Sequence, residues 1–549
     1  MGKTEPLSNV DAAWLGMEDP TNLMMVTGIL TFNEVVDLEL IKEVLRKRFL
    51  KFDRFTQRIV QNRLPLAAPY WEEDADFDLN AHIHRIALPA PGDQKALQEL
   101  VSDLMSTPLD FTKPPWQMHL VENFGEGCAI VVRLHHAVAD GIALIYVLLS
   151  LTDMTPEASL NHPPLEEKPQ NGGERGGLVS ALFKQAASTL RTTRRVTNRV
   201  LDEGWETLNN PSRAVELAIQ GTDTAVAAGR LVFRSPDPPT LFRGELGVAK
   251  RAAWSKPLSL KEVKAIKNVT GSTVNDVLIA AMVGGLRRYL LVREQKVEGL
   301  NFRAAVPVNL RKKEEMGTLG NKFGIVYLSL PVGVADPFDR LQLVHKRMEQ
   351  LKNTPEAMVA IGILNAIGMS PPELQAQSVS MFASKATAVM TNVPGPPIPL
   401  YLAGKKIENL MFWVPQAGRV ALGISILSYA GKVYLGVNTD ACLVPDPDEI
   451  IDGFYAEFDA LLELARQVED HLVREPTPPA APVPLTPTVN VNTASAADLD
   501  ALPGIGAATA QRIVAYRDEN GRFTAVDELA RVAGISEAKL GLIREHITL

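Results

Sequence analysis

A proline-rich stretch near the carboxyl end sets the first limit on how this chain folds. The sequence "REPTPPAAPVPLTPT", residues 474–488, contains six prolines, and each proline removes a backbone donor and restricts φ. Helices and sheets do not tolerate that density of proline, so we expect an extended spacer. The spacer predicts a large segment before residue 474 and a small module over residues 489–549.

Composition places the large segment among ordinary folded proteins. Hydrophobic residues make up 46% of the chain and charged residues 22%, as in globular domains. The two cysteines, Cys128 and Cys442, give no disulfide framework and favour a reducing cytoplasm. We find no signal-peptide pattern and no apolar run of spanning length, so we expect any membrane contact to be peripheral. The net charge of -8 gives no general reason to expect nucleic-acid binding.

Strand and helix patterns alternate through the large segment. The β-branched runs "CAIVVRL" (128–134) and "FGIVYLSLPV" (323–332) favour strands. The periodic stretches 259–266, 273–292 and 448–472 favour helices. This mixture predicts α/β layers, and the Pro- and Gly-rich connector over 161–177 predicts two lobes.

We therefore expect five regions. They are an N-terminal lobe over 1–175, a helical basic crossover over 176–235, a C-terminal lobe over 236–473, the proline-rich linker over 474–488, and the small module over 489–549.

The crossover contains a basic amphipathic pattern over residues 178–201, which has no acidic residue. On a helix, one face would carry apolar residues (Val179, Leu182, Ala186, Leu190, Val196, Val200) and the other basic ones (Lys184, Arg191, Arg195, Arg199). This pattern fits either a surface helix packed on a lobe or an interfacial helix on anionic membrane.

The stretch "RLHHAVADGIALIYVLLS", residues 133–150, is the strongest candidate site. His135 and His136 stand where a buried strand ends and a helix begins. Successive strand residues point to opposite faces, so the pair is poorly suited to one metal ion. The chain has no Gly-x-Ser-x-Gly elbow for a nucleophilic triad. Two interpretations remain: a histidine base acting on an activated carbonyl, or two histidines that cap a core turn.

The His-His-x-x-x-Asp-Gly pattern resembles the signature of the coenzyme-A-dependent acyltransferase superfamily. That resemblance implies a two-lobed, chloramphenicol-acetyltransferase-like α/β fold. It also implies that His136 is the general base, with His135 beside it at the site entrance. Asp140 would be structural and held by an arginine, for which Arg311 is a plausible partner, although Asp140 could also cap the helix. Gly141 would let the backbone bend into the helix.

Further segments resemble the bacterial wax ester synthase/acyl-CoA:diacylglycerol acyltransferase family in family order. They are "LSNVDAAWLGMEDPTNLMMVTGILTF", "PLDFTKPPWQMHLVE", "TVNDVLIAAMVGGLRRYL", "AAVPVNLRKKEEMGTLGNKFG" and "TNVPGPPIPLYLAGKKI". The second segment has Pro115 where the family's Pro-Leu-Trp block has leucine. The supporting residues implied by these segments are Trp116, Asn275, Asp276, Asn309, Arg311 and Asn321. The choice between packing and substrate contact stays open for Asn309 and Asn321, whereas the Asn275–Asp276 pair is implied to be mainly architectural.

The resemblance implies an O-acyltransferase that needs no cofactor or metal. The co-substrate would be a fatty acyl-CoA and the acceptor a long-chain alcohol or a diacylglycerol. It would work at the cytoplasmic face of the membrane or on lipid inclusions. Two alternatives are an acyltransferase acting on a non-lipid alcohol or amine, and a DNA-binding or scaffold protein with an inactive acyltransferase fold.

The module over 489–549 resembles the tandem helix-hairpin-helix unit of competence-type DNA-uptake proteins, which implies a small all-α domain. The hairpins "LPGIG" and "VAGIS" make Gly504, Gly506 and Gly534 candidate phosphate contacts. From Asn490 onward, however, six basic residues face eight acidic ones, whereas DNA-binding surfaces gather positive charge. DNA contact and protein interaction both stay open.

Overall fold

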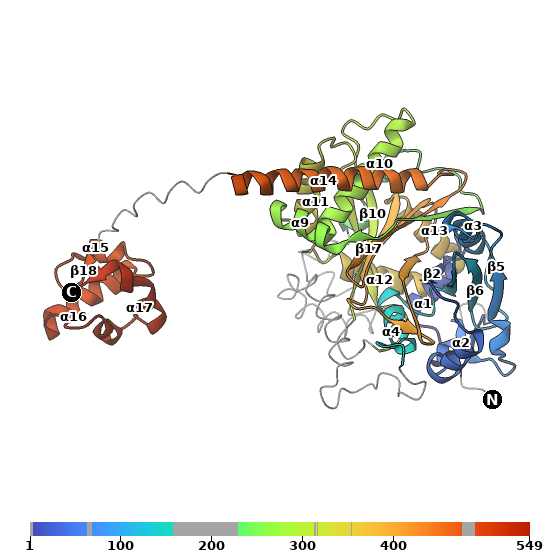
Figure 1. Ribbon diagram of the computed structural model, residues 1–549, viewed down its shortest axis with the longest axis horizontal. Coiled ribbons are helices and arrows are strands. Elements are labelled where there is room, and N and C mark those ends of the chain that lie inside the picture. Colours follow the sequence, from blue (N-terminus) through green and yellow to red (C-terminus); the bar gives the residue numbers. More distant parts are fainter. Residues whose placement is uncertain are drawn as a thin grey trace. The chain divides into compact units, whose positions relative to one another are not determined.

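The computed structural model describes residues 4–62, 68–157, 229–311, 315, 317–352, 354–474 and 489–549. The chain divides into two compact units, residues 1–468 and 469–549 (Figure 1). The first unit contains two large mixed sheets, each with its own buried apolar core. We call these two halves the N-terminal lobe and the C-terminal lobe.

The N-terminal lobe is built on a five-stranded sheet in the order β15-β2-β7-β6-β5. Its strands are β2 (Met25–Phe32), β5 (Ile83–Ala87), β6 (Trp116–Phe124), β7 (Gly127–His135) and β15 (Asn409–Trp413). Its helices are α1 (Asn9–Gly16), α2 (Leu38–Val44), α3 (Gln94–Met105) and α4 (Gly141–Leu151). A small sheet joins β1 (Thr4–Pro6), β4 (Tyr70–Glu73) and β3 (Gln57–Val60). The predicted strand over 128–134 is confirmed as part of β7, which is nearly all buried as its continuous apolar run requires.

The C-terminal lobe is built on a seven-stranded sheet. Its strands are β8 (Lys250–Trp254), β9 (Leu258–Ser259), β10 (Phe302–Asn309), β11 (Phe323–Leu330), β12 (Ala388–Pro394), β16 (Leu422–Tyr429) and β17 (Lys432–Asp440). Its helices are α9 (Leu260–Thr270), α10 (Val274–Val292), α11 (Pro337–Lys352), α12 (Glu356–Gly368), α13 (Pro372–Ala383) and α14 (Asp448–Arg474). The predicted strand over 323–332 and the three predicted helices are confirmed.

The lobes exchange a strand. β15 follows the short pair β13 (Tyr401–Leu402) and β14 (Lys405–Lys406) and forms an antiparallel edge against β2. Residues around 400–413 therefore bury their apolar side chains in the N-terminal core, which differs from the boundary drawn at residue 236. Sequence periodicity identifies a strand but does not say which sheet it joins.

The second unit has a separate core formed by its own residues. Its elements are β18 (Val489–Asn490), α15 (Ala496–Asp500), α16 (Ala507–Asn520), a 3₁₀ helix (Val526–Arg531), α17 (Glu537–Ile543) and β19 (Ile547–Thr548). β18 pairs in parallel with β19, which ties the two ends of this unit together. We call residues 489–549 the tail.

Several predicted segments lie outside the described residues: the connector over 161–177, the basic amphipathic segment over 178–201, and the proline-rich spacer after Arg474. Among the described helices, no single one combines the length and apolar character needed to cross a membrane. α9 and α10 do so only when taken together, and they meet at a bend of 97°.

Candidate active site

The two adjacent histidines leave the end of β7 in different directions. The His135 amide donates to the Pro115 carbonyl at 2.9 Å, and the His136 amide donates to the Met24 carbonyl at 2.7 Å. Their rings then contact different groups of aromatic side chains, as the alternation of side chains along a strand requires. The pair is thus not arranged around one common ion.

The His136 ring is enclosed by aromatic side chains. It stacks on Trp14 with ring centroids 4.5 Å apart, and Phe323 meets it edge-on at 5.7 Å. Trp14 belongs to α1 and Phe323 opens β11, so the ring lies between elements of both lobes. Burial lowers the pKa of His136 to about 4, although the charge of Asp140 acts in the opposite direction. The imidazole is therefore neutral at physiological pH.

His135 has a different environment. Its side chain is fully buried, and its Nδ1 accepts a hydrogen bond from the Ala137 amide at 3.1 Å. That bond places the ring proton on Nε2, which lies 3.5 Å from Oε2 of Glu18. The expected position of His135 at the site entrance is therefore wrong, because the ring holds the turn from inside.

Asp140 performs both of the roles that the sequence left open. Its Oδ1 accepts the Ala143 amide at 3.0 Å and so caps α4. Its Oδ2 accepts Nε and Nη2 of Arg311 at 3.1 and 2.9 Å, and also the Lys322 amide at 3.0 Å. The predicted Asp140–Arg311 pair is present and buried, and it joins the start of α4 to the C-terminal lobe.

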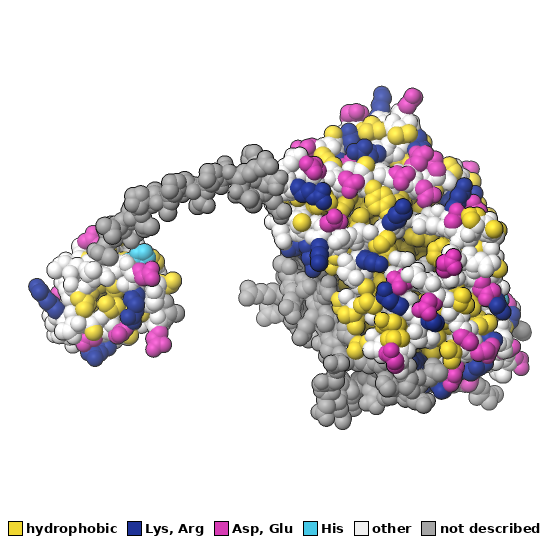
Figure 2. Space-filling view, viewed as in Figure 1, with side chains coloured by type: hydrophobic (Ala, Val, Ile, Leu, Met, Phe, Trp, Pro, Cys, Tyr) yellow, Lys and Arg dark blue, Asp and Glu magenta, His cyan; other side chains and the backbone are white. Residues whose placement is uncertain are grey.

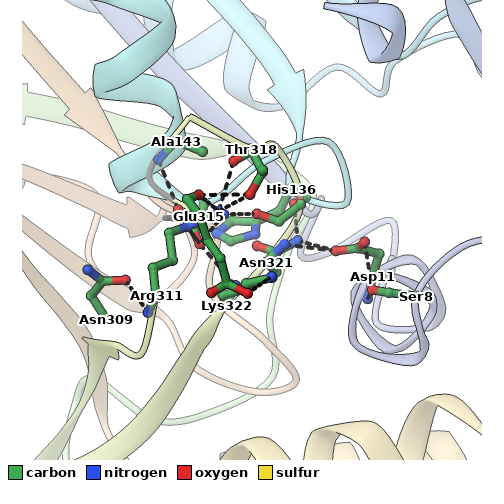
Figure 3. Close-up of polar contacts among 12 residues, drawn as sticks. Ser8, Asp11, His136, Ala143, Asn309, Arg311, Glu315, Thr318, Asn321 and Lys322 are labelled. Carbon is green, nitrogen blue, oxygen red and sulfur yellow. Dashed lines mark hydrogen bonds and ion pairs between the residues drawn. The ribbon is translucent and has the colours of Figure 1, made fainter. Parts of the chain in front are cut away.

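The loop between β10 and β11 holds Arg311 in position (Figure 3). Asn309 Oδ1 accepts the Arg311 amide at 3.1 Å, which shapes the backbone after β10. Nη1 of Arg311 donates to the Thr318 carbonyl at 2.8 Å, and Nη2 donates to the Gly320 carbonyl. Asn309 thus acts on the packing of the loop.

Asn321 connects this loop to the backbone of the turn that follows β7 at His136. Its Nδ2 donates to the His136 carbonyl at 2.8 Å and to Oδ1 of Asp11 at 2.7 Å. Ser8 donates to the other carboxylate oxygen of Asp11 at 2.7 Å. Figure 3 shows Asn321 between His136 and Asp11. Burial raises the pKa of Asp11, and these hydrogen bonds compensate for part of that cost.

Asn275 and Asp276 stabilise the C-terminal lobe at the start of α10. Asp276 forms a capping box with Thr273 and lies 2.7 Å from Nδ1 of His345 on α11. Asn275 Oδ1 accepts Nδ2 of Asn392 at 2.7 Å. These contacts are architectural.

Gly141 and Trp116 are the two remaining residues of the N-terminal lobe that the resemblance implied. Gly141 has no positive φ, and a Cβ there would meet Cγ2 of Val393 at an ordinary 3.6 Å. The expected need for glycine at this bend is therefore wrong. Trp116 is buried in the N-terminal core, and its Nε1 donates to the Phe55 carbonyl at 2.9 Å.

Trp14 and Asp11 are the site residues that sequence reasoning missed. Both lie in the quoted segment "LSNVDAAWLG", on a short helix where most residues are buried. A buried carboxylate and a buried indole on such a helix need polar partners. This requirement is the sequence signal that could have identified the two residues. Their partners, in contrast, come from distant parts of the chain.

The candidate phosphate-binding glycines of the tail differ in conformation. Gly504 and Gly534 have positive φ values of 77° and 100°, which favour glycine in the hairpins. Gly506 instead precedes α16 with an extended backbone. In Figure 2 the visible face of the tail carries basic and acidic side chains together, so DNA contact stays a prediction.

Family models match three parts of the chain. Residues 7–278 match the wax ester synthase/diacylglycerol acyltransferase catalytic domain, and residues 319–462 match the C-terminal domain of the same family. Residues 486–548 match the helix-hairpin-helix motif.

Curated relatives and solved structures agree with these matches. A probable diacylglycerol O-acyltransferase of Mycobacterium tuberculosis is 29% identical over 456 residues, covering 81% of this chain and 93% of the relative. A putative one of Mycobacterium bovis is 30% identical over 385 residues, covering 68% and 79%.

The wax ester synthase/diacylglycerol acyltransferase of Marinobacter aquaeolei VT8 matches with a TM-score of 0.59 at 23% identity, covering 84% of this chain and 99% of that one. A condensation domain of the calcium-dependent antibiotic synthetase matches with a TM-score of 0.51 at 14% identity, covering 84% and 96%. These matches confirm the predicted two-lobed acyltransferase fold.

Proposed function

Because this chain belongs to the wax ester synthase/diacylglycerol acyltransferase family, we propose that His136 is the general base with which it esterifies a long-chain alcohol or a diacylglycerol. The chain is an acyl-CoA-dependent O-acyltransferase. One observation carries the assignment of the base: a neutral imidazole with a lowered pKa lies between the two lobes, at the turn they jointly hold.

The proposed reaction is a direct transfer. Neutral His136 takes the proton of the acceptor hydroxyl while that oxygen attacks the thioester carbonyl carbon. The tetrahedral intermediate collapses, the carbon–sulfur bond breaks, and coenzyme A leaves as a thiolate. The imidazolium then returns its proton to the sulfur, which regenerates His136 and leaves an ester and free coenzyme A. An imidazolium with a lowered pKa is a strong acid toward a thiolate, so the second proton transfer is favourable.

The residues around His136 support its protonation and deprotonation in this reaction. The negative charge of Asp140 favours the imidazolium, and Arg311 forms a buried ion pair with that carboxylate. The Trp14 stack fixes the plane of the ring. Trp14, Asp140 and Arg311 thus act as positioning residues, since each works through His136 or its turn.

We propose that the reaction takes place at the inner face of the cell membrane or on lipid inclusions. Long-chain alcohols, diacylglycerols and their ester products partition out of water because of their acyl chains. An enzyme acting on them has to meet a lipid phase.

Thiol release from palmitoyl-CoA by the full-length protein tests the acceptor. We expect release to depend on added hexadecanol or dipalmitoylglycerol, with the corresponding ester appearing in equal amount. Equal release with a polar alcohol or an amine would favour a non-lipid acceptor. No release with any acceptor would favour a scaffold with an inactive fold.

His136→Ala tests the base, and His119→Ala is its matched control. His119 is another buried histidine of the N-terminal lobe whose pKa burial lowers to about 4, but it lies within β6. We expect His136→Ala to reduce kcat by about 100-fold or more and His119→Ala to affect mainly stability. Equal turnover in the two variants would contradict the assignment.

A further inference from the structure

The segment formed by α12 and α13 contains unusually little charge. From residue 356 to residue 384 the only charged residues are Glu356 and Glu373, whereas charged residues make up 22% of the whole chain. Glu356 is buried and accepts a hydrogen bond from Arg234 at 2.7 Å. Glu373 is thus the one exposed charge that this segment itself supplies.

The outer side of this segment presents large apolar side chains to solvent. Met369 and Leu374 are each 53% exposed and Met381 is 39% exposed. Leu374 and Met381 are seven residues apart on α13, so they lie on the same side of the helix, two turns apart. Surface helices of globular proteins normally place charged residues in such positions.

A second pair of exposed apolar residues lies at the carboxyl end of α13. Lys385, just beyond the helix, donates from Nζ to the Leu231 carbonyl at 2.6 Å and also to the Val232 carbonyl. This contact brings Val232 and Phe233, which are 38% and 87% exposed, to that end. We call Val232, Phe233, Met369, Leu374 and Met381 the apolar face.

The inner side of the same segment reaches the active site. Ile361, Leu364 and Ile367 of α12 belong to the buried apolar cluster that contains Trp14 and Phe323. Val379 and Phe382 of α13 pack against this cluster. Trp14 and Phe323 are the two rings that contact His136. One apolar layer therefore lies between the apolar face and the rings around His136.

We propose that the apolar face docks on a phospholipid bilayer that contains the acceptor. This inference rests on the proposed function, because a diacylglycerol acceptor resides in a bilayer. Exposed apolar groups that are continuous with a site for such a substrate suit a hydrocarbon boundary better than water.

The charge of the apolar face predicts which bilayer it binds. Three basic side chains beside it are engaged within the protein, since Arg234 pairs with Glu356, and Lys385 and Arg243 bind backbone carbonyls. The exposed Arg230 and Glu373 carry opposite charges. The face therefore binds neutral zwitterionic lipid, with little dependence on salt. A basic segment such as residues 178–201 would instead need anionic lipid and would lose affinity at high salt.

Flotation of the full-length protein with phosphatidylcholine vesicles containing dioleoylglycerol tests the proposal. We expect binding at both low and high salt. The double variant Leu374→Gln/Met381→Gln should bind at least tenfold less. Its matched control, Leu291→Gln/Val292→Gln, changes two residues at the end of α10 that are 45% and 74% exposed and should bind like the wild type.

Turnover separates docking from catalysis. The Leu374→Gln/Met381→Gln variant should lose about tenfold in activity on vesicular dioleoylglycerol and keep wild-type thiol release with octanol, an aliphatic alcohol supplied without vesicles. An equal loss with octanol, wild-type binding by the variant, or binding that needs anionic lipid and low salt would each overturn the proposal. If, without lipid, the wild type were a dimer and the variant a monomer, the apolar face would bind a second copy of the chain. That result would also overturn the proposal. Vesicle binding without turnover on any acceptor would overturn the proposed function instead.

Discussion

The turn at His136 and the hairpins of the tail both lead into a helix, but they are held by contacts of very different range. Asn321 reaches Asp11 across 310 positions of the sequence, and Arg311 reaches Asp140 across 171. In the tail, the side chain of Asn492 binds the Phe523 backbone across only 31 positions. The turn at His136 thus depends on contacts from both lobes, whereas the tail hairpins depend on residues close to them in the sequence.

The largest effect should come from removing the charge that joins the lobes. Arg311→Met leaves Asp140 buried without its cation, and we expect the free energy of unfolding of the acyltransferase unit to fall by about 3–5 kcal/mol. Urea unfolding measures this change. Lys405→Met, which breaks the exposed pair with Glu34, should cost less than about 1 kcal/mol. Equal losses would mean that the buried pair does not hold the turn.

The buried His136 ring should make the free energy of unfolding depend on pH. Its pKa is about 4 in the folded protein and 6.5 in the unfolded chain, so the unfolded state binds more protons between these values. The stabilisation is complete above pH 6.5 and is lost as the pH falls toward 4, by about 3 kcal/mol. Comparing His136→Asn with the wild type at pH 7 and pH 4 isolates this term. A difference that does not change with pH would show that the ring is not buried in its neutral form.

Asn321→Ala should have a smaller effect on the same turn. It removes the donor shared by Asp11 and the His136 carbonyl, and unsatisfied buried acceptors cost about 1–3 kcal/mol. We expect reduced stability together with reduced turnover. Asn301→Ala removes an exposed hydrogen bond and serves as the control, with turnover close to wild type.

The smallest effect should stay within the tail. Gly504→Ala puts a side chain on a backbone with a φ of 77°, which costs about 1–2 kcal/mol. Gly506→Ala is the control, because its extended backbone and open surroundings accept a Cβ. Acyl transfer should be unchanged in both variants. Loss of activity in Gly504→Ala would show that the tail takes part in the reaction.

The range of these contacts also explains what the sequence could predict. The family resemblance implies both His136 and Asp140 and suggests Arg311, whereas the N-cap role of Asp140 can be predicted from its immediate neighbours. The tail motif predicted its hairpins because the interacting residues are close in sequence. Nothing local could show that Trp14 stacks on His136 or that β15 joins the N-terminal sheet, since both depend on how distant segments pack.

The predictions for His135 and Gly141 are wrong for the same reason, because both came from the resemblance without knowledge of the tertiary contacts. The resemblance implies that His135 lies at the site entrance, but its hydrogen bond with the Ala137 amide and its complete burial turn the ring inward. The resemblance likewise implies a conformational role for Gly141, but the backbone there does not require glycine. A motif therefore indicates which residues belong to the site, but the role of each one depends on its tertiary contacts.

We propose that the two lobes hold His136 buried and neutral so that it accepts the acceptor's proton. The pH dependence of kcat/KM tests this most directly, because it reports the pKa of the base in the free enzyme. With folding checked at each pH, we expect kcat/KM to stay level from pH 8 to about pH 5 and to be half lost near pH 4, where the His136 pKa lies. A midpoint near 6.5, the value of an exposed histidine, would contradict the claim.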